Sequence, residues 1–323
     1  MMNTTNIDPE LVSAIAQLEA VFGESACLNL DNLEAARDLI SSMAVASRSA
    51  APCRPNIESK RLTIHDKELN IDVRLQTYQP KSGNKVQAAI LYLHGGGYVV
   101  GSADQAETRL SAWSEDLNVL VVSVEYRLAP ENPFPAGLFD SLACLKWLSS
   151  DASNTNIERI AIVGESAGGG LAAGLSLYVR DHSDIDIALM ALLYPMIDHT
   201  NFEQVGTADD DYLVWNRANN KFSWQAYLSN SIDREMLPYA AAASATNVSN
   251  LPRSYICVGD QDLFFKENQS FAKRLKSAGV DTTLDIYAGG FHGFPEVAPE
   301  AMISKRFNKN LFNALQDALC NFG

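Results

Sequence analysis

The sequence predicts an α/β fold with a mostly parallel central sheet and helices on both faces of that sheet. Six short apolar runs with the length of buried strands recur along the chain, and amphipathic stretches separate them. Buried strands that alternate with helices are typical of a parallel sheet covered on both sides. Two of these runs end in glycine-rich turns, which places the turns at the carboxyl edge of the sheet, where active sites of such folds lie.

The beginning of the chain predicts helices followed by a hairpin. Apolar residues recur at helical spacing from Asp8 to about Val45. Residues 51–56 contain two prolines and are interpreted as a linker. From Arg61 to Tyr78 apolar and polar residues alternate, which favours an antiparallel hairpin with one face in water.

The six predicted buried strands follow this hairpin. They are residues 87–93, 117–124, 157–163, 187–193, 254–258 and 283–286. Amphipathic residues between them predict helices, for example over 106–116, 138–148 and 268–278. The segment between Tyr194 and Ser254 is rich in aromatic residues and longer than one crossover helix needs, so we interpret it as an insertion.

The composition indicates a folded protein whose main partner is neither nucleic acid nor an anionic membrane. Hydrophobic residues make up 47% and charged residues 20%, as in ordinary globular proteins. The formal net charge of −14 repels phosphate backbones and anionic lipid, so neither nucleic acid nor a membrane is expected as a partner. No secretory signal or membrane-spanning run is recognised, and five scattered cysteines favour a reducing compartment. We therefore expect a cytoplasmic protein.

Gly164-x-Ser166-x-Gly168 has the form of a nucleophile elbow, because it follows a predicted strand and precedes an Ala/Leu-rich helix. In such a turn, the residues two before and two after the serine approach neighbouring backbone so closely that only small side chains fit. The N–H of Ala167 then points to the place where an oxyanion forms. A dinucleotide-binding fingerprint that starts at Gly168 fits only in outline, since its first glycine should directly follow the strand.

His94-Gly95-Gly96-Gly97 is a second glycine-rich turn at a predicted strand end. Its backbone N–H groups are not covered by side chains, so those of Gly96 and Gly97 are expected to join Ala167 in a three-donor oxyanion hole. Each donor of this kind typically contributes about 3 kcal/mol of transition-state stabilisation. The order of the two turns along the chain fits the glycine loop and the elbow of one sheet.

A catalytic serine of this type needs an acid and a histidine later in the chain, in that order. Of the five histidines, His292 comes late, follows a predicted strand and lies in a glycine-rich loop. Asp260 and Asp262 both follow the strand 254–258. Asp262 is preferred because the two apolar residues after it can bury it against the imidazole, where it fixes the tautomer; Asp260 is the alternative.

Five motifs occur in a characteristic order. They are His94–Gly97, Tyr126–Glu131 with Phe134–Ala136, Gly164–Gly169, Asp262–Phe264 and Phe291–Phe294. Together, from about residue 85 to 295, they resemble the microbial hormone-sensitive-lipase-like esterases, the HGGG-bearing branch of the α/β-hydrolases. The resemblance implies an α/β-hydrolase fold with a helical cap, Ser166 as nucleophile and Asp262 and His292 as its triad partners.

The resemblance also implies the division of the chain. Residues 1–50 and the insertion at 196–245 form the cap, and residues 51–195 and 246–323 form the two parts of the hydrolase core. The Tyr126–Glu131 motif is interpreted as an architectural turn held by an ion pair.

Four further residues are expected to contact substrate. They are Tyr98, Glu165, Tyr194 and Trp215. Aromatic residues of the insertion have two open roles, since they line either the substrate pocket or only the core of the cap.

The predicted function is hydrolysis of short- to medium-chain carboxylic esters through an acyl-enzyme intermediate, with a small-molecule ester as partner and neither metal nor organic cofactor. A related acyl hydrolase on the same triad is the alternative: a carbohydrate or small-molecule deacetylase, a lactonase or an amidase. A binding module on this fold is disfavoured because all three triad residues are present. A nucleotide-dependent oxidoreductase is disfavoured by the placement of Gly168. A homodimer is compatible with the sequence.

Overall fold

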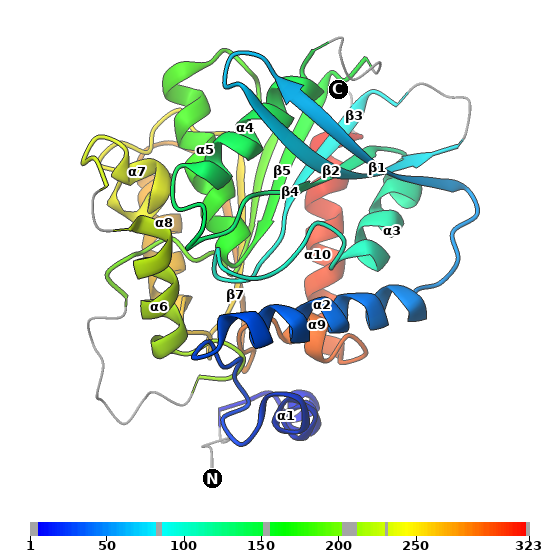
Figure 1. Ribbon diagram of the computed structural model, residues 1–323, viewed down its shortest axis with the longest axis vertical. Coiled ribbons are helices and arrows are strands. Elements are labelled where there is room, and N and C mark those ends of the chain that lie inside the picture. Colours follow the sequence, from blue (N-terminus) through cyan, green and yellow to red (C-terminus); the bar gives the residue numbers. More distant parts are fainter. Residues whose placement is uncertain (1–5, 82–85, 151–155, 202–211, 230–231, 321–323) are drawn as a thin grey trace.

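Eight strands form one sheet in the computed structural model, which describes residues 6–81, 86–150, 156–201, 212–229 and 232–320 (Figure 1). The strand order is β1-β2-β4-β3-β5-β6-β7-β8. Both β1 and β4 pair antiparallel with β2, and every other neighbouring pair is parallel. The bounds are β1 Ile57–Asp66, β2 Ile71–Pro80, β3 Ala88–Leu93, β4 Leu120–Glu125, β5 Arg159–Glu165, β6 Leu189–Leu193, β7 Ser254–Gly259 and β8 Thr282–Tyr287.

Helices cover both faces of this sheet. On one face, buried residues of α4, α5 and α8 share a core with the strands, and on the other face those of α3 and α10 do so. The bounds are α1 Pro9–Phe22, α2 Leu33–Ala50, α3 Glu107–Leu117, α4 Ala136–Leu148, α5 Ala167–His182, α6 Arg217–Leu228, α7 Leu237–Ala240, α8 Phe265–Ser277, α9 Phe294–Val297 and α10 Met302–Leu319. Across the described ranges, no helix has the length and apolar character to cross a bilayer.

The central strands show why the sequence reads as continuous apolar runs. All six residues of β3 are buried. Its odd-numbered residues from Ala89 to Leu93 belong to one core, and its even-numbered residues from Ala88 to Tyr92 belong to the other. Because side chains of a strand alternate between the faces, a strand covered on both sides has no polar face. The predicted mostly parallel, doubly covered sheet is therefore confirmed.

The predicted antiparallel hairpin is confirmed as β1 and β2. Among the six predicted buried strands, the boundary that differs most from the prediction is the start of β4. The sequence predicted a strand from Leu117, whereas Leu117 is the last residue of α3 and β4 begins at Leu120. The chain turns at Asn118, whose φ of +54° is left-handed, and Leu117 packs into the core beside the sheet. A buried apolar helix end directly before a buried strand gives one uninterrupted apolar run.

Phe307 of α10 offers a test of the core that supports the carboxyl edge of the sheet. Its fully buried ring lies 5.2 Å from the Tyr287 ring and 5.5 Å from the Phe294 ring, centroid to centroid. We expect F307A to lower the free energy of unfolding by about 3–5 kcal/mol, because it removes transfer energy and leaves a cavity. Urea denaturation measures this, with F222A as matched control, since Phe222 of α6 is 36% exposed. Equal losses in both variants would contradict the packing described.

Candidate active site

A single residue, Ser166, separates the end of β5 from the start of α5. Its φ of +53° and ψ of −118° are sparsely populated for a residue with a side chain, and such conformations cost about 1–3 kcal/mol. Backbone hydrogen bonds hold the turn: Ser166 N–H donates to Leu193 O at 2.9 Å, and Ser166 O accepts from Met196 N–H at 2.9 Å. The surrounding sheet and helix therefore fix the serine in a strained position.

The two outer glycines of the elbow are required by close backbone contacts. A Cβ atom at Gly164 would lie 2.1 Å from Gly168 O, and a Cβ atom at Gly168 would lie 2.1 Å from Leu93 O. Contacts this short with backbone atoms cannot be relieved by rotating a side chain. The close approach that the sequence predicted is present.

Ser166, His292 and Asp262 form one hydrogen-bonded row. The Oγ of Ser166 lies 2.9 Å from Nε2 of His292, and Nδ1 of His292 lies 2.8 Å from Oδ2 of Asp262. All three side chains are buried. The other carboxylate oxygen of Asp262 accepts from Phe264 N–H at 2.8 Å, and the Phe264 ring meets the imidazole edge to face at 5.1 Å. The orientation of the imidazole is thus fixed by Asp262 and by packing.

Asp260, the alternative acid, points elsewhere. Its Oδ1 accepts from Gly289 N–H at 2.8 Å and from the Gln261 side chain at 2.9 Å. Asp260 therefore supports the loop that carries His292, whereas Asp262 touches the imidazole itself.

The glycine loop after β3 lies against the elbow, since the backbone of Leu93 and His94 contacts Gly168. Gly96 and Gly97 have φ values of +120° and +58°. Within the described part of the chain, the N–H groups of Gly96, Gly97 and Ala167 donate to no protein acceptor. These three donors remain free for a ligand.

His94 at the start of this loop is a buried structural residue. Its ring stacks on Tyr126 at 4.1 Å, and its Nδ1 lies 2.8 Å from Gly95 O. Burial lowers the pKa of His94 and so favours the neutral imidazole. The Tyr126 hydroxyl donates to His94 O at 2.8 Å, which ties the loop to the Tyr126–Glu131 motif.

Two of the four expected substrate contacts lie on or near the glycine loop. A Cβ atom at Gly97 would lie 2.2 Å from an indole carbon of Trp215, so the Trp215 ring covers this glycine. Tyr98 has protein partners: its ring stacks on Tyr227 of α6 at 3.8 Å, and its hydroxyl donates to Met196 O at 2.9 Å.

The other two, Tyr194 and Glu165, have protein partners on the α3 side of the triad. The Tyr194 ring meets His292 edge to face at 4.9 Å, and its hydroxyl donates to Glu296 at 2.8 Å. The carboxylate of Glu165 pairs with Arg109 of α3. Burial by itself raises the pKa of Glu165, but the charge and hydrogen bond of Arg109 outweigh it and hold this pKa below its usual value.

Sequence reasoning missed Arg109 and Glu296. Arg109 pairs with Glu296 of α9 as well as with Glu165, and these two pairs place one cation between two carboxylates beside the triad. Arg109 lies within an amphipathic stretch where an arginine is ordinary, and Glu296 lies two residues past the last motif. No local pattern in the sequence singles them out.

The Tyr126–Glu131 motif is held by two ion pairs. Arg127 pairs with Asp140 of α4 at 2.8 Å, and Glu131 pairs with Arg37 of α2 at 2.8 Å. Arg37 also donates to Val99 O at 2.9 Å. The motif therefore joins α2 to the end of the glycine loop, in addition to stabilising its own turn.

Glu267 lies in the first turn of α8. Its carboxylate accepts from Ile197 N–H at 2.8 Å and from Asp198 N–H at 3.2 Å, so it fastens the segment after β6. Because the group is buried, the pKa of Glu267 is raised well above its usual value.

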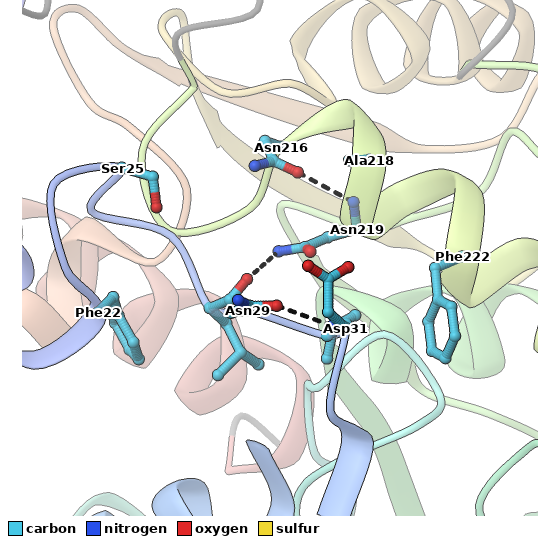
Figure 2. A pocket seen from close by; sticks show the side chains of 10 residues that line it. Phe22, Ser25, Asn29, Asp31, Asn216, Ala218, Asn219 and Phe222 are labelled. Carbon is cyan, nitrogen blue, oxygen red and sulfur yellow. Dashed lines mark hydrogen bonds between the residues drawn. The ribbon is translucent and has the colours of Figure 1, made fainter. Parts of the chain in front are cut away.

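The N-terminal segment and the insertion contact each other. Cys27 and Val214 form a parallel bridge, and the Asn219 side chain donates to Leu28 O at 2.7 Å. Figure 2 shows side chains of both segments around one pocket, among them Phe22, Asn29 and Asn219. A pocket of about 270 Å³ lies at this junction. It is lined by Phe22, Ser25, Leu28, Asn29, Leu30, Asp31, Asn216, Ala218, Asn219 and Phe222. Residues 202–211 and 230–231 of the predicted cap lie outside the described residues, so the extent of the cap stays a prediction.

A family model described as the alpha/beta hydrolase fold matches residues 90–296, which is more than half of the chain. The chain belongs to the alpha/beta hydrolase family. The parallel sheet with its strand–serine–helix turn agrees with this assignment, and the predicted fold is confirmed.

Known proteins support the assignment. Ethyl acetate hydrolase of Pseudomonas putida is 30% identical over 300 residues, which cover 90% of this chain and 92% of that protein. The structure of a bacterial heroin esterase matches with a TM-score of 0.89 at 29% identity, over 99% of this chain and 100% of that chain. An esterase from the bacterial hormone-sensitive lipase family matches with a TM-score of 0.79 at 26% identity, over 99% and 100%. The predicted resemblance to hormone-sensitive-lipase-like esterases is confirmed.

Replacement of Gly168 tests the geometry of the elbow. We expect G168A to lower the melting temperature strongly or to prevent folding, because its Cβ would meet the backbone of Leu93 and His94. G137A is the matched control: Gly137 lies in the first turn of α4, and its added Cβ would meet nothing closer than 3.4 Å. Since alanine favours helix, G137A should be neutral or slightly stabilising. A G168A protein as stable as G137A would contradict the close approach.

Proposed function

We propose that this protein is a serine carboxylesterase that hydrolyses short- to medium-chain esters through an acyl-enzyme intermediate. The row from Asp262 through His292 to Ser166, with distances of 2.8 and 2.9 Å, carries the proposal. The relatives reported above are named as an ethyl acetate hydrolase and as esterases, which supports carboxylic ester hydrolysis as the reaction class.

Acylation begins when Ser166 Oγ attacks the carbonyl carbon of the ester. His292 Nε2 takes the hydroxyl proton, and Asp262 stabilises the imidazolium that forms. The electron pair of the broken carbonyl π bond becomes an oxyanion, which accepts hydrogen bonds from the N–H groups of Gly96, Gly97 and Ala167. Collapse of this intermediate breaks the ester C–O bond, and His292 gives its proton to the leaving alkoxide.

Deacylation repeats these steps with water as the nucleophile. His292, again neutral, takes a proton from water, and the resulting hydroxide attacks the acyl carbon. The oxyanion forms at the same three donors. Cleavage of the bond to Ser166 Oγ releases the carboxylic acid, and the serine recovers its proton from His292. Side chains, backbone and water carry every step of this proposal.

The residues around the glycine loop favour substrates with small acyl or alcohol groups. The Trp215 ring covers Gly97, so bulky groups beside the oxyanion donors would meet an aromatic wall. Trp215 directly precedes Asn216, the N-cap of α6, at the junction of the insertion with the N-terminal segment. We propose that the cap, formed by residues 1–50 and 196–245, selects substrates by size.

The proposal is tested by turnover of p-nitrophenyl esters from acetate to palmitate, with an amide and a lactone included. We expect the highest kcat/KM at short to medium chains, and S166A should lower it by at least about 10⁴-fold because the nucleophile is lost. S176A is the matched control: this serine lies on α5, and its hydroxyl donates to Ala172 O within the helix at 2.8 Å.

Undetectable ester turnover by the wild type, or an S166A protein as active as S176A, would overturn the proposed function. Preference for the amide or the lactone over every ester would replace it with another acyl hydrolase on the same triad.

A further inference from the structure

Arg109 of α3 pairs with one carboxylate beside each of the two turns that carry Ser166 and His292. On one side it pairs with Glu165, the residue directly before Ser166. On the other side it pairs with Glu296 of α9, the short helix that follows His292. Glu296 lies 187 residues from Arg109 in the sequence. One guanidinium therefore bridges the elbow and the histidine loop.

The elbow side of this bridge is firmly held. The Glu165 side chain is only 9% exposed. Arg109 Nη2 also donates to the Tyr92 hydroxyl at 2.9 Å, and its guanidinium lies over the rings of Tyr92 and Trp113 at 5.7 and 5.4 Å. Packing against two aromatic faces restricts the arginine, so Glu165 is fixed relative to β3 and α3.

On the histidine side of the bridge, two contacts connect Glu296 to the imidazole of His292. The oxygen of Glu296 that does not face Arg109 accepts from the Tyr194 hydroxyl at 2.8 Å. The Tyr194 ring then packs edge to face against His292 at 4.9 Å and an interplanar angle of 69°. The positions of α9, Tyr194 and His292 are thereby coupled to Arg109.

The chemistry of arginine suits this task. Its planar guanidinium presents five donors in a rigid fork, so its two terminal nitrogens engage two carboxylates at once, in fixed directions. A lysine ammonium is a point charge on a flexible stem and does not define the separation of two carboxylates in the same way.

We propose that Arg109 is a positioning residue for the ester hydrolysis proposed above: it fixes the separation of the elbow from the histidine loop and thereby the Ser166–His292 hydrogen bond. Arg109 acts through Glu165 and through Glu296 with Tyr194, and it does not touch the reacting atoms. Because displacement of reacting groups by about 1 Å can lower a rate about 100-fold, loss of this bridge should reduce the rate of the chemical steps.

The test compares E296Q, R109K and R109M with wild type, using p-nitrophenyl butyrate and thermal unfolding of the full chain. E296Q is the key variant because Glu296 is 40% exposed, so the fold should tolerate the neutral amide. E300Q is the matched control: this glutamate lies on the surface near α9 and pairs with Lys305 at 2.8 Å, away from the triad.

We expect E296Q to lower kcat about tenfold and R109M about 100-fold, with KM changed less than about twofold, since positioning affects the chemical step. R109K should recover part of the kcat lost in R109M. E300Q should match wild type, and the melting temperature of E296Q should stay within a few degrees of it. E296Q and R109M combined should be no slower than R109M alone, because both break one bridge.

The inference is overturned if E296Q keeps the wild-type kcat, or if its kcat falls only in proportion to its folded fraction. E296Q decides this even where R109M does not fold. The inference and the proposed function are refuted by different results. If the wild type is active, S166A is inactive and E296Q is fully active, only the positioning role of Arg109 is refuted. If the wild type does not hydrolyse esters, the proposed function is refuted.

Discussion

The close approach of backbone around Ser166 is the constraint on which the rest of the site depends. Gly164, Gly168 and Leu93 meet at distances that leave no room for a Cβ, and the serine between them is held at a positive φ. This turn places Ser166 between the end of β5 and the start of α5, so Ala167 N–H lies next to the serine in the first turn of the helix. The proposed nucleophile and one proposed oxyanion donor are therefore fixed by one steric arrangement.

The sheet assembles the remaining groups around that turn. The glycine loop follows β3, Ser166 follows β5, Asp262 follows β7 and His292 follows β8. These strands run parallel, so residues distant in sequence converge at one edge of the sheet. The residues of the proposed mechanism lie on loops and turns. The buried strands, whose side chains fill two cores, give those loops a rigid base.

The sequence predicted those parts of the site that leave a local signature. Gly164-x-Ser166-x-Gly168 directly after a predicted strand and before an Ala/Leu-rich helix predicts a sharp strand-to-helix turn. His292 and Asp262 were selected from their order and strand ends, and both are hydrogen-bonded in one row with Ser166. Glu165 was expected to contact substrate, but its ion pair with Arg109 depends on tertiary packing and leaves no periodic or motif signal. The end of α3 at Leu117 was missed for a similar reason, since a buried helix end and a buried strand are equally apolar.

The proposed mechanism requires Ser166 to be the activated nucleophile of a serine hydrolase. The most direct measurement is labelling of the native protein with a fluorophosphonate, followed by tandem mass spectrometry of its peptides. We expect stoichiometric phosphonylation of Ser166 alone, with a parallel loss of ester turnover. We expect no labelling of the unfolded protein, because only the folded row of Asp262, His292 and Ser166 activates the hydroxyl. Labelling of another residue, or none in a folded protein, would contradict the claim.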